Sequence, residues 1–344
     1  MKAAVFYEPG LVKVEEHTKP EILADEVLVR VMAAGVCGTD LHIYAGAKGA
    51  SECYPPVILG HEFCGIVEAV GEEVTHVKVG DHVTIDPNLT CGKCYNCQVG
   101  KPHFCENLYA TGVTGDGGFA EYAKAKEQQT YVLNPDVPFE EGAMCEPLGC
   151  CLHGIDLAGI KTGDTVLVIG GGTIGLIMVQ LARMAGASTV IVSEPQENKW
   201  AAAKMVGADF VIHPMKQNPN DLKHLGLIRN VNVAIECVGA RSSIQDALKY
   251  VCQGGHVLLF GITPPDMELP ILPYEIFQRE LTITASYLNP NTHGRAADLV
   301  NSRKLKLAEL ISDRLELDEI GQAFIIRGRN GKMMIYPNGQ DAAR

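Results

Sequence analysis

The spacing of hydrophobic residues changes near residue 147, and the change separates two kinds of structure. Before it, segments rich in β-branched residues end at glycine or proline turns, at 27–35, 57–71 and 81–87. Such segments are typical of short β-strands joined by irregular loops. We therefore predict an all-β region over the first third of the chain.

After residue 147, short apolar segments alternate with segments of helical period. Residues 172–186 place apolar side chains three and four positions apart and stop at Gly186, which predicts a helix, and another is predicted at 242–253. Buried strands are predicted around them, at 165–170, 188–194, 208–214, 231–237, 255–261 and 281–287. This alternation predicts an α/β fold with a parallel, doubly wound sheet.

The length of 344 residues exceeds the roughly 250–300 at which a single core usually stops growing, so two domains are expected. Helices are predicted at 295–305 and 317–328, and a β-like segment at 332–337 is expected to return to the N-terminal region. We predict one domain from 1–147 plus 288–344 and a second from 148–287.

The net charge of −12 and the pI of about 5.4 argue against nucleic acid or an anionic membrane as partners, because both attract basic surfaces. No apolar run reaches 18 residues, and the N-terminus lacks the apolar region of a signal peptide. Twelve cysteines without a disulfide-like framework fit a reducing compartment. A soluble, cytoplasmic protein is expected.

Four cysteines follow the spacing C-x2-C-x2-C-x7-C, at Cys91, Cys94, Cys97 and Cys105. Four thiolates at this spacing can converge on one tetrahedral zinc, and four protein ligands close such a site to substrate. Ferredoxin-like iron–sulfur runs also place cysteines two apart, but no proline follows Cys105 and the last spacing is long. A structural zinc is favoured, with coincidence in a cysteine-rich chain as the alternative.

A glycine motif, G-x-G-x-x-G, lies between a predicted strand and a predicted helix, at Gly170, Gly172 and Gly175. In this context the glycines allow a tight turn, close approach of a pyrophosphate and close helix–strand packing. Thr173 and Ile174 complete the predicted cofactor loop. Without that context, such a turn only joins a strand to a helix.

Glu194 ends the next predicted strand, about 20 residues further on. A carboxylate there can bind both ribose hydroxyls and repel a 2′-phosphate, so NAD is favoured over NADP. Lys199 is predicted near the cofactor, where it either offsets this repulsion or lies along the adenosine. A surface glutamate in an ordinary loop is the alternative.

Cys37 and the pair His61-Glu62, together with the segment Cys145-Glu146-Pro147, are candidates for a second, open metal site. A thiolate, an imidazole and a carboxylate supply three ligands and leave a position for water or an alcohol oxygen. Taken singly, each has a simpler interpretation, since buried cysteines are usually small core residues.

Several segments together resemble the zinc-containing medium-chain dehydrogenases, and most closely the sorbitol (polyol) and threonine dehydrogenase branch. They are GVCGTDLHIY, GHEFCGIVEAVG, the four-cysteine segment, GGFAEY, CEPLGCCLHG and VIGGGTIG. The resemblance covers nearly the whole chain. It implies a β-rich, GroES-like catalytic domain completed by the C-terminal segment, a Rossmann domain that binds NAD, and two zinc ions per chain.

The resemblance makes Cys37 and His61 ligands of a catalytic zinc, with Glu62 and Glu146 at two carboxylate positions used directly or through water. Glu62 is thus both a ligand and a catalytic candidate. Glu146 is preferred over its neighbour Cys145 because EPLG matches the polyol branch. Zinc as a Lewis acid would lower the pKa of a bound alcohol before hydride passes to the nicotinamide.

Thr39 and His42 match the proton-relay positions of that branch. Histidine exchanges protons near neutral pH, which suits a relay. His42 could instead structure the metal loop, and Asp40 could orient a metal ligand.

Substrate contacts are predicted from Tyr44, Ser286 and Tyr287. The sorbitol enzymes carry an arginine–tyrosine pair where this chain has Ser286-Tyr287. The missing guanidinium would have donated hydrogen bonds to substrate hydroxyls, which weakens the prediction that sorbitol itself is the substrate. Asn289 and Thr292 lie in a loop that is expected to face the same cleft.

A phosphorylated substrate would require a basic cluster, for which Lys48, Arg279 and Arg295 are the candidates. We expect an NAD-dependent oxidoreductase acting on a secondary alcohol, such as a polyol or sugar alcohol with or without phosphate. Threonine or another amino alcohol is the alternative, and a catalytically inactive zinc-binding family member is the non-enzyme alternative. A homotetramer, or else a dimer, is expected, with residues 271–287 as an interface edge.

Overall fold

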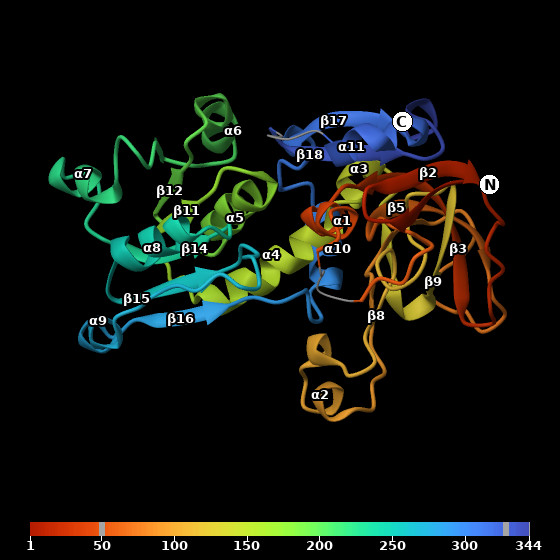
Figure 1. The fold of residues 1–344 in the computed structure, drawn as a ribbon, viewed down its shortest axis with the longest axis horizontal. Helices are drawn as coiled ribbons and strands as arrows, with labels where there is room; N and C mark the ends of the chain where they lie inside the picture. Colours follow the sequence, from red (N-terminus) through yellow and green to blue (C-terminus); the bar gives the residue numbers. More distant parts are fainter. Residues whose placement is uncertain (48–51, 326–329, 344) are drawn as a thin grey trace. The chain divides into compact units, whose positions relative to one another are not determined.

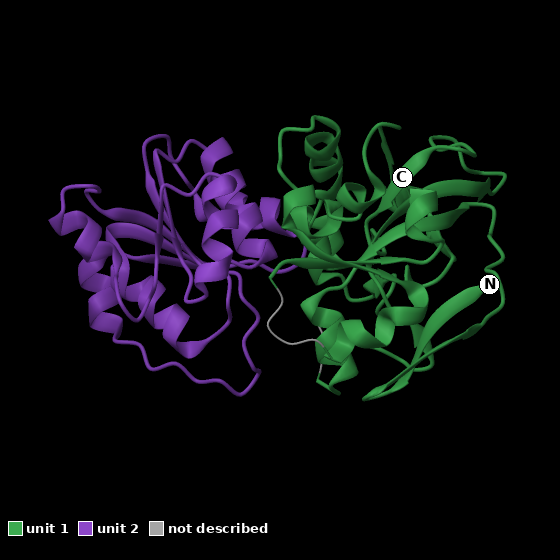
Figure 2. Ribbon diagram, turned by 90° about the horizontal axis from the view of Figure 1, so that it is seen from above, with its two compact units in different colours: residues 1–149, 289–344 green, residues 150–288 purple. Residues whose placement is uncertain are grey.

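The computed structural model describes residues 1–47, 52–325 and 330–343, which form two compact units (Figures 1 and 2). Unit 1 comprises Met1–Gly149 and Asn289–Arg344, and unit 2 comprises Cys150–Leu288. The sequence places a division at 147/148 and 287/288.

Unit 2 contains a six-stranded sheet in which every neighbouring pair of strands is parallel. Its strands are β11 (Thr165–Ile169), β12 (Thr189–Ser193), β13 (Phe210–Ile212), β14 (Val231–Glu236), β15 (Val251–Leu259) and β16 (Thr282–Ala285). The order β13-β12-β11-β14-β15-β16 reverses direction between β11 and β14. This is the doubly wound order of dinucleotide-binding sheets, in which ligands bind beyond the carboxyl ends of the strands at the reversal point.

The central strands of unit 2, β11, β12 and β14, are almost entirely buried, whereas the edge strand β16 is mostly exposed. Leu167, Ile191, Ala234 and Val257 belong to one buried cluster. The helices are α4 (Cys145–Ala158), which begins in unit 1, α5 (Thr173–Met184), α6 (Trp200–Met205), α7 (Pro219–His224), α8 (Arg241–Tyr250) and α9 (Pro273–Arg279). Strands buried on both faces read as continuous hydrophobic runs, which explains the sequence pattern.

The predicted helix 242–253 is too long. Helix α8 ends at Tyr250, and residues 251–253 belong to β15. Arg279 donates hydrogen bonds to the carbonyl oxygens of Leu248 and Val251, so a side chain distant in sequence satisfies backbone acceptors at the end of this helix.

Unit 1 is mainly antiparallel β-structure. Its strands are β1 (Lys2–Glu8), β2 (Leu11–Glu16), β3 (Glu26–Gly35), β4 (Val57–Ile58), β5 (Glu62–Val70), β6 (His82–Ile85), β7 (Asn88–Leu89), β8 (Tyr109–Ala110), β9 (Tyr122–Lys126), β10 (Thr130–Leu133), β17 (Ile311–Glu316) and β18 (Lys332–Tyr336). The largest sheet has the order β10-β6-β5-β3-β18-β17, with β9 also paired to β3. The C-terminal strand β18 therefore lies against β3, one of the first strands of the chain.

Short helices connect these strands. They are α1 (Gly38–Tyr44), α2 (Tyr95–Gln98), α3 (Phe139–Gly142), α10 (His293–Asn301) and α11 (Ile320–Ile325). Of the predicted helix 317–328, residues 326–328 lie outside the described residues. No helix within the described ranges combines the length and apolar character needed to cross a membrane.

Between β7 and β8, the segment with α2 projects from the rest of unit 1 (Figure 1). We call residues 90–108 the cysteine lobe.

Candidate metal and dinucleotide sites

The cysteine lobe brings together the sulfur atoms of Cys91, Cys94, Cys97 and Cys105. All four Sγ atoms lie within 4.8 Å of one another, and Cys94 Sγ is 4.0 Å from Cys105 Sγ. A tetrahedral zinc with bonds of 2.3 Å requires sulfur–sulfur separations of about 3.8 Å. Helix α2 buries none of its side chains, so a bound ion would replace an apolar core in this lobe.

Backbone amides surround these sulfurs. The amide of Cys94 donates to Cys91 Sγ over 3.4 Å, and that of Asn107 donates to Cys105 Sγ over 3.4 Å. Hydrogen bonds from the backbone N–H groups of Lys93 and Cys94 lower the pKa of Cys91 to about 6. Because a thiolate is the form that binds metal, this arrangement fits the predicted closed site.

A second group of donors lies where β3 and β5 meet. Cys37 precedes α1, directly after β3, and His61-Glu62 stands at the start of β5. The register of the two strands pairs Gly35 with Glu62, which brings the segments together. One donor atom from each of Cys37, His61 and Glu62 lies within 4.8 Å of the other two.

The electrostatics of this open site favour a cation. The buried carboxylate of Asp40 accepts a 2.8 Å hydrogen bond from the Cys37 amide and places its other oxygen 3.5 Å from Nδ1 of His61. Burial alone would lower the pKa of His61, but Asp40 and Cys37 raise it well above its usual value. The approach of Asp40 to Nδ1 leaves Nε2 as the ligand atom, which is the arrangement expected for a metal-binding histidine.

The buried polar atoms of this cluster contact one another as charged pairs. Asp40 Oδ1 lies 3.5 Å from His61 Nδ1, and Glu62 Oε2 forms an ion pair with Lys332. The thiolate, imidazole and carboxylate donors fit a zinc ion here.

Glu146 is buried in the first turn of α4, but it lies outside the group of three donors. Its neighbour Cys145 is also buried, and burial raises the pKa of its thiol to about 12, even with a hydrogen bond from Thr84. Neither residue joins a donor group in the described part of the chain, so the choice of Glu146 over Cys145 stays a prediction.

One residue of the open site was missed in the sequence. Lys332, the first residue of β18, is buried and forms an ion pair with Glu62. Burial alone would lower the pKa of Lys332, but the charges of Glu62, Cys37 and Glu146 raise it. The available signal was a lysine that opens a strongly apolar terminal strand.

The predicted relay and substrate residues of unit 1 lie on α1. Thr39 is half-buried and His42 is exposed. Tyr44 donates a 2.9 Å hydrogen bond to the Gly10 carbonyl and stacks on Phe324, with ring centroids 4.7 Å apart. These contacts account for Tyr44 by packing, and its role as a substrate wall stays a prediction.

The glycine motif forms the turn between β11 and α5. Gly170 has a φ of +105°, which residues with a side chain rarely adopt. A Cβ atom on Gly175 would lie 1.8 Å from the Gly170 carbonyl oxygen, so only glycine allows this approach of helix to strand. Gly172, Thr173 and Ile174 lie at the start of α5, where free N–H groups can bind a phosphate.

Glu194 lies directly beyond β12 and is held by two backbone amides. Its Oε2 accepts from Gly171 and its Oε1 from Gln196, both over 2.8 Å. The Trp200 indole donates to the Glu194 carbonyl over 2.9 Å. Gly171 is thus a member of the site that the motif did not single out, while Lys199 is half-buried and precedes α6.

The substrate residues predicted in unit 2 follow β16. The Ser286 hydroxyl is buried without a partner among the described residues, and Tyr287 is partly exposed. Asn289 and Thr292 are both buried inside unit 1, and the position of their loop at the substrate cleft stays a prediction. Asn289 bonds to Asn88 and Asp86, and Thr292 donates to the Gly149 carbonyl over 2.7 Å.

The structure does not bring the three predicted phosphate-binding residues, Lys48, Arg279 and Arg295, together in one described cluster. The guanidinium of Arg279 is engaged at the end of α8, as described above. Lys48 lies outside the described residues. Arg295 lies in α10 of unit 1.

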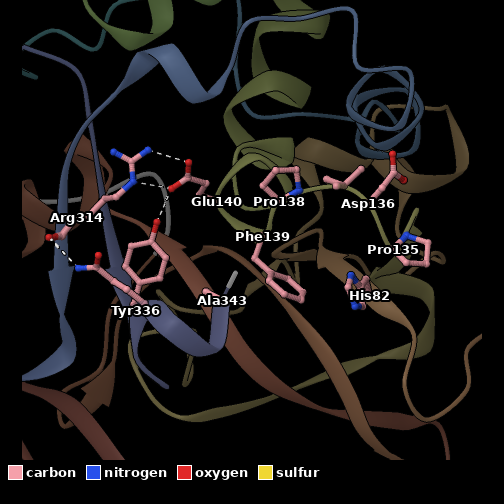
Figure 3. A pocket seen from close by; sticks show the side chains of 11 residues that line it. His82, Pro135, Asp136, Pro138, Phe139, Glu140, Arg314, Tyr336 and Ala343 are labelled. Carbon is pink, nitrogen blue, oxygen red and sulfur yellow. Dashed lines mark hydrogen bonds and ion pairs between the residues drawn. The ribbon is translucent and has the colours of Figure 1, made fainter.

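A cavity of about 470 Å³ lies elsewhere in unit 1 (Figure 3). The Arg314 guanidinium forms two 2.8 Å hydrogen bonds to Glu140, and the Tyr336 hydroxyl donates to the same carboxylate. None of the predicted metal or cofactor residues lines this cavity. The positive charge of Arg314 in the cavity lining is neutralised by its pair with Glu140.

Comparisons with known proteins find two family models that match along the chain. Residues 23–136 match the alcohol dehydrogenase GroES-like domain, and residues 173–302 match the zinc-binding dehydrogenase family. The chain is 32% identical to sorbitol dehydrogenase of Bacillus subtilis (strain 168) over 98% of both chains. It is 36% identical to L-threonine 3-dehydrogenase of Thermococcus kodakarensis over 98% of this chain and 97% of that protein.

Among solved structures, one from Sinorhizobium meliloti 1021 is assigned to the zinc-binding dehydrogenases and contains NADP. Its TM-score is 0.93, with 39% identity over 98% of this chain and 99% of that one. Together with the two family matches, this likeness confirms the predicted fold class, a Rossmann domain with a β-rich GroES-like domain.

Proposed function

The chain belongs to the zinc-containing medium-chain alcohol dehydrogenase family, and from this premise we propose that it interconverts a secondary alcohol and its ketone with NAD. Polyols and sugar alcohols, with their ketoses, are the proposed substrates. The observation that carries the proposal is the donor group of partly buried Cys37 with buried His61 and Glu62, which offers a cation a thiolate, an imidazole and a carboxylate.

Cys37 and His61 are the proposed ligands of the catalytic zinc, with Glu62 and Glu146 as the two carboxylates that act directly or through water. Zinc held there supplies a Lewis acid that favours the ionised form of an alcohol, and the nicotinamide accepts the hydride. Asp40 orients His61 through Nδ1.

The alcohol proton must reach solvent during oxidation. Thr39 and His42 are the proposed relay, and the exposure of His42 suits its solvent end. The four cysteines of the lobe are proposed to hold a second, structural zinc whose role is to replace the missing apolar core.

NAD rather than NADP is the proposed cofactor. Glu194 supports this choice, because a buried carboxylate held by two amides would face a 2′-phosphate with a like charge. The glycine loop, with Gly170, Gly172 and Gly175, would receive the pyrophosphate. The NADP in the Sinorhizobium protein belongs to that protein and makes a direct comparison of both cofactors essential.

Threonine is the second candidate substrate, supported by the similarity to a threonine dehydrogenase. A polyol is preferred because two different polyol enzymes, a sorbitol dehydrogenase and a D-arabinitol dehydrogenase, are among the relatives. Tyr44, Ser286 and Tyr287 are the proposed substrate contacts. The proposal of a phosphorylated substrate is weakened, because the Arg279 guanidinium already bonds to the Leu248 carbonyl.

A homotetramer is the proposed assembly, with a dimer as the alternative. β16 ends the sheet of unit 2, and edge strands carry backbone groups that can pair with another copy. Ile283 on β16 and Tyr274 and Phe277 on α9 are exposed large apolar side chains. All twelve cysteines are free, which supports the proposed cytoplasmic location.

The test of function combines zinc content with a substrate screen. Reduction of NAD and NADP would be followed with polyols, sugar-alcohol phosphates, simple secondary alcohols and threonine. Two zinc ions per chain and turnover of a polyol support the proposal. One zinc and no turnover would identify an inactive family member, and preference for threonine would select the second candidate.

A further inference from the structure

Lys332 is a buried cation at a site that is itself proposed to bind a cation. The residue is only 6% exposed, and its Nζ forms an ion pair with Oε2 of Glu62, whose side chain is 1% exposed. A lysine this deeply buried requires a charged partner, since an isolated ammonium would be strongly destabilising.

The β-sheet creates the space for this pair. Gly35 on β3 is paired with Glu62 on β5 and with Met334 on β18, so the two charged side chains come from strands on either side of it. A Cβ atom on Gly35 would lie 2.3 Å from Glu62 Oε2 and 2.7 Å from Lys332 Cε. The glycine is therefore needed for space, and the ion pair lies across it.

Two opposite electrostatic effects follow from this position. Without metal, the ammonium neutralises part of the charge of the two buried carboxylates, Glu62 and Glu146. With metal, the same fixed charge repels the incoming cation and competes with it for Glu62. A lysine that only supported packing of β18 would produce neither effect on metal affinity.

We propose that Lys332 is a positioning residue of the open site, which holds the Glu62 carboxylate across Gly35, stabilises the metal-free fold and limits the affinity for zinc. This inference rests on the proposed metal-binding role of Cys37, His61 and Glu62. It makes Glu62 an exchangeable donor that is shared between the metal and an internal cation.

The test measures zinc affinity and stability separately in Lys332→Met. Competition with a chromogenic chelator gives the affinity of the open site, and thermal unfolding is followed with only the lobe zinc bound. We expect the form with one zinc to unfold at a lower temperature, while affinity for the second zinc rises on the order of tenfold to a hundredfold. Unchanged or weaker zinc binding would overturn the proposal.

Lys19→Met is the matched control. Lys19 lies 3.5 Å from Glu68, which like Glu62 is on β5, but the two side chains are 42% and 40% exposed, and the Lys19 ammonium also lies over the Tyr122 ring. Zinc affinity should not change and the unfolding temperature should change little, because exposed ion pairs and exposed cation–π contacts contribute little. Lys332→Arg keeps the charge and should keep zinc affinity within about threefold of the unmodified protein.

If Lys332→Met does not fold, Glu62→Gln and the double variant Glu62→Gln/Lys332→Met replace it. Glu62→Gln leaves the ammonium unpaired, so adding Lys332→Met should recover stability and strengthen zinc binding relative to Glu62→Gln alone. Weaker zinc binding in the double variant would overturn the proposal. Cys37→Ser distinguishes a failure of the Lys332 proposal from a failure of the proposed metal site. If this variant retains both zinc ions, the proposed metal site itself is wrong.

Discussion

The backbone amide of Gly171 donates a 2.8 Å hydrogen bond to Oε2 of Glu194. This bond joins the glycine loop after β11 to the carboxylate after β12. Because the Gln196 amide holds the other oxygen, the side chain cannot turn away from a ligand without losing two hydrogen bonds. The negative charge of Glu194 therefore stays close to the phosphate-binding turn.

We predict a preference for NAD over NADP of roughly thirty-fold to a thousand-fold in kcat/KM. It corresponds to about 2–4 kcal/mol, for a lost charge-assisted hydrogen bond together with repulsion of the 2′-phosphate. Glu194→Ala should narrow this gap, and the retained Lys199 should help the variant to accept NADP.

Glu197→Ala is the matched control for Glu194→Ala. Glu197 lies three residues away, but it is exposed and pairs with Lys216 over 2.9 Å. It should leave the ratio of the two cofactors unchanged. Equal use of NADP by the unmodified protein would show that Glu194 is not the ribose ligand.

Cys37→Ser should remove one zinc per chain and reduce turnover on the order of a thousand-fold or more, because it eliminates a proposed ligand of the open site. NAD binding should be nearly unchanged, since the glycine loop is untouched. Metal analysis, initial rates and a cofactor titration measure the three quantities. Cys252→Ser, which changes a cysteine outside both donor groups, should retain both metals and full activity.

The donor groups could be predicted because their residues are close in sequence or have recognisable neighbours. His61 and Glu62 are adjacent, and the cysteines of the lobe are separated by short spacers. Lys332 could not be predicted in the same way. It reaches Glu62 only because β18 pairs with β3, and strand register is not visible in residue spacing.

The loop after β16 contains contacts that residue spacing could not predict. Asn289 and Thr292 are polar residues in a short loop, and their side chains bond to partners in unit 1, among them the Gly149 carbonyl. Local polarity predicts a loop, but it does not reveal which buried groups that loop satisfies.

Cys94→Ser should damage stability before chemistry. The lobe lacks a buried apolar core in α2, so loss of a ligand should lower Tm by roughly 5–10 °C. Residual activity per folded molecule should stay high. Calorimetry with metal analysis provides the test, and a variant with one zinc and an unchanged Tm would contradict the structural role.

The proposed assembly predicts that charge at the edge of unit 2 lowers the oligomeric state. Phe277→Asp and Ile283→Asp should produce smaller species in light scattering, because each places a carboxylate on an exposed apolar surface beside β16. Met215→Asp is the control, since Met215 is also highly exposed but lies after β13. An unchanged mass in both edge variants would place the interface elsewhere.

His293 gives unit 1 a defined sensitivity to acid. The residue is fully buried, lies 3.3 Å from Thr84 Oγ1 through Nε2, and packs on Tyr131. Burial lowers the pKa of His293 to about 3. Below the unfolded value of about 6.5, the unfolded chain binds a proton that the folded protein excludes, so stability is lost as pH falls from 6.5 towards 3.

The variant that tests this sensitivity is His293→Gln, which keeps a nitrogen able to bond to Thr84. Its stability relative to the unmodified protein should improve by up to about 1.4 kcal/mol for each pH unit below 6.5, as measured by urea unfolding from pH 7.5 to 4.5. Asp86→Asn provides a contrast of opposite sign. Burial raises the pKa of Asp86 to about 6, so the folded protein binds the extra proton and stability falls as pH rises from about 4 to 6. The relative stability of Asp86→Asn should therefore improve with rising pH in that window.

A pH-independent difference between His293→Gln and the unmodified protein would mean that His293 is not held neutral by the fold.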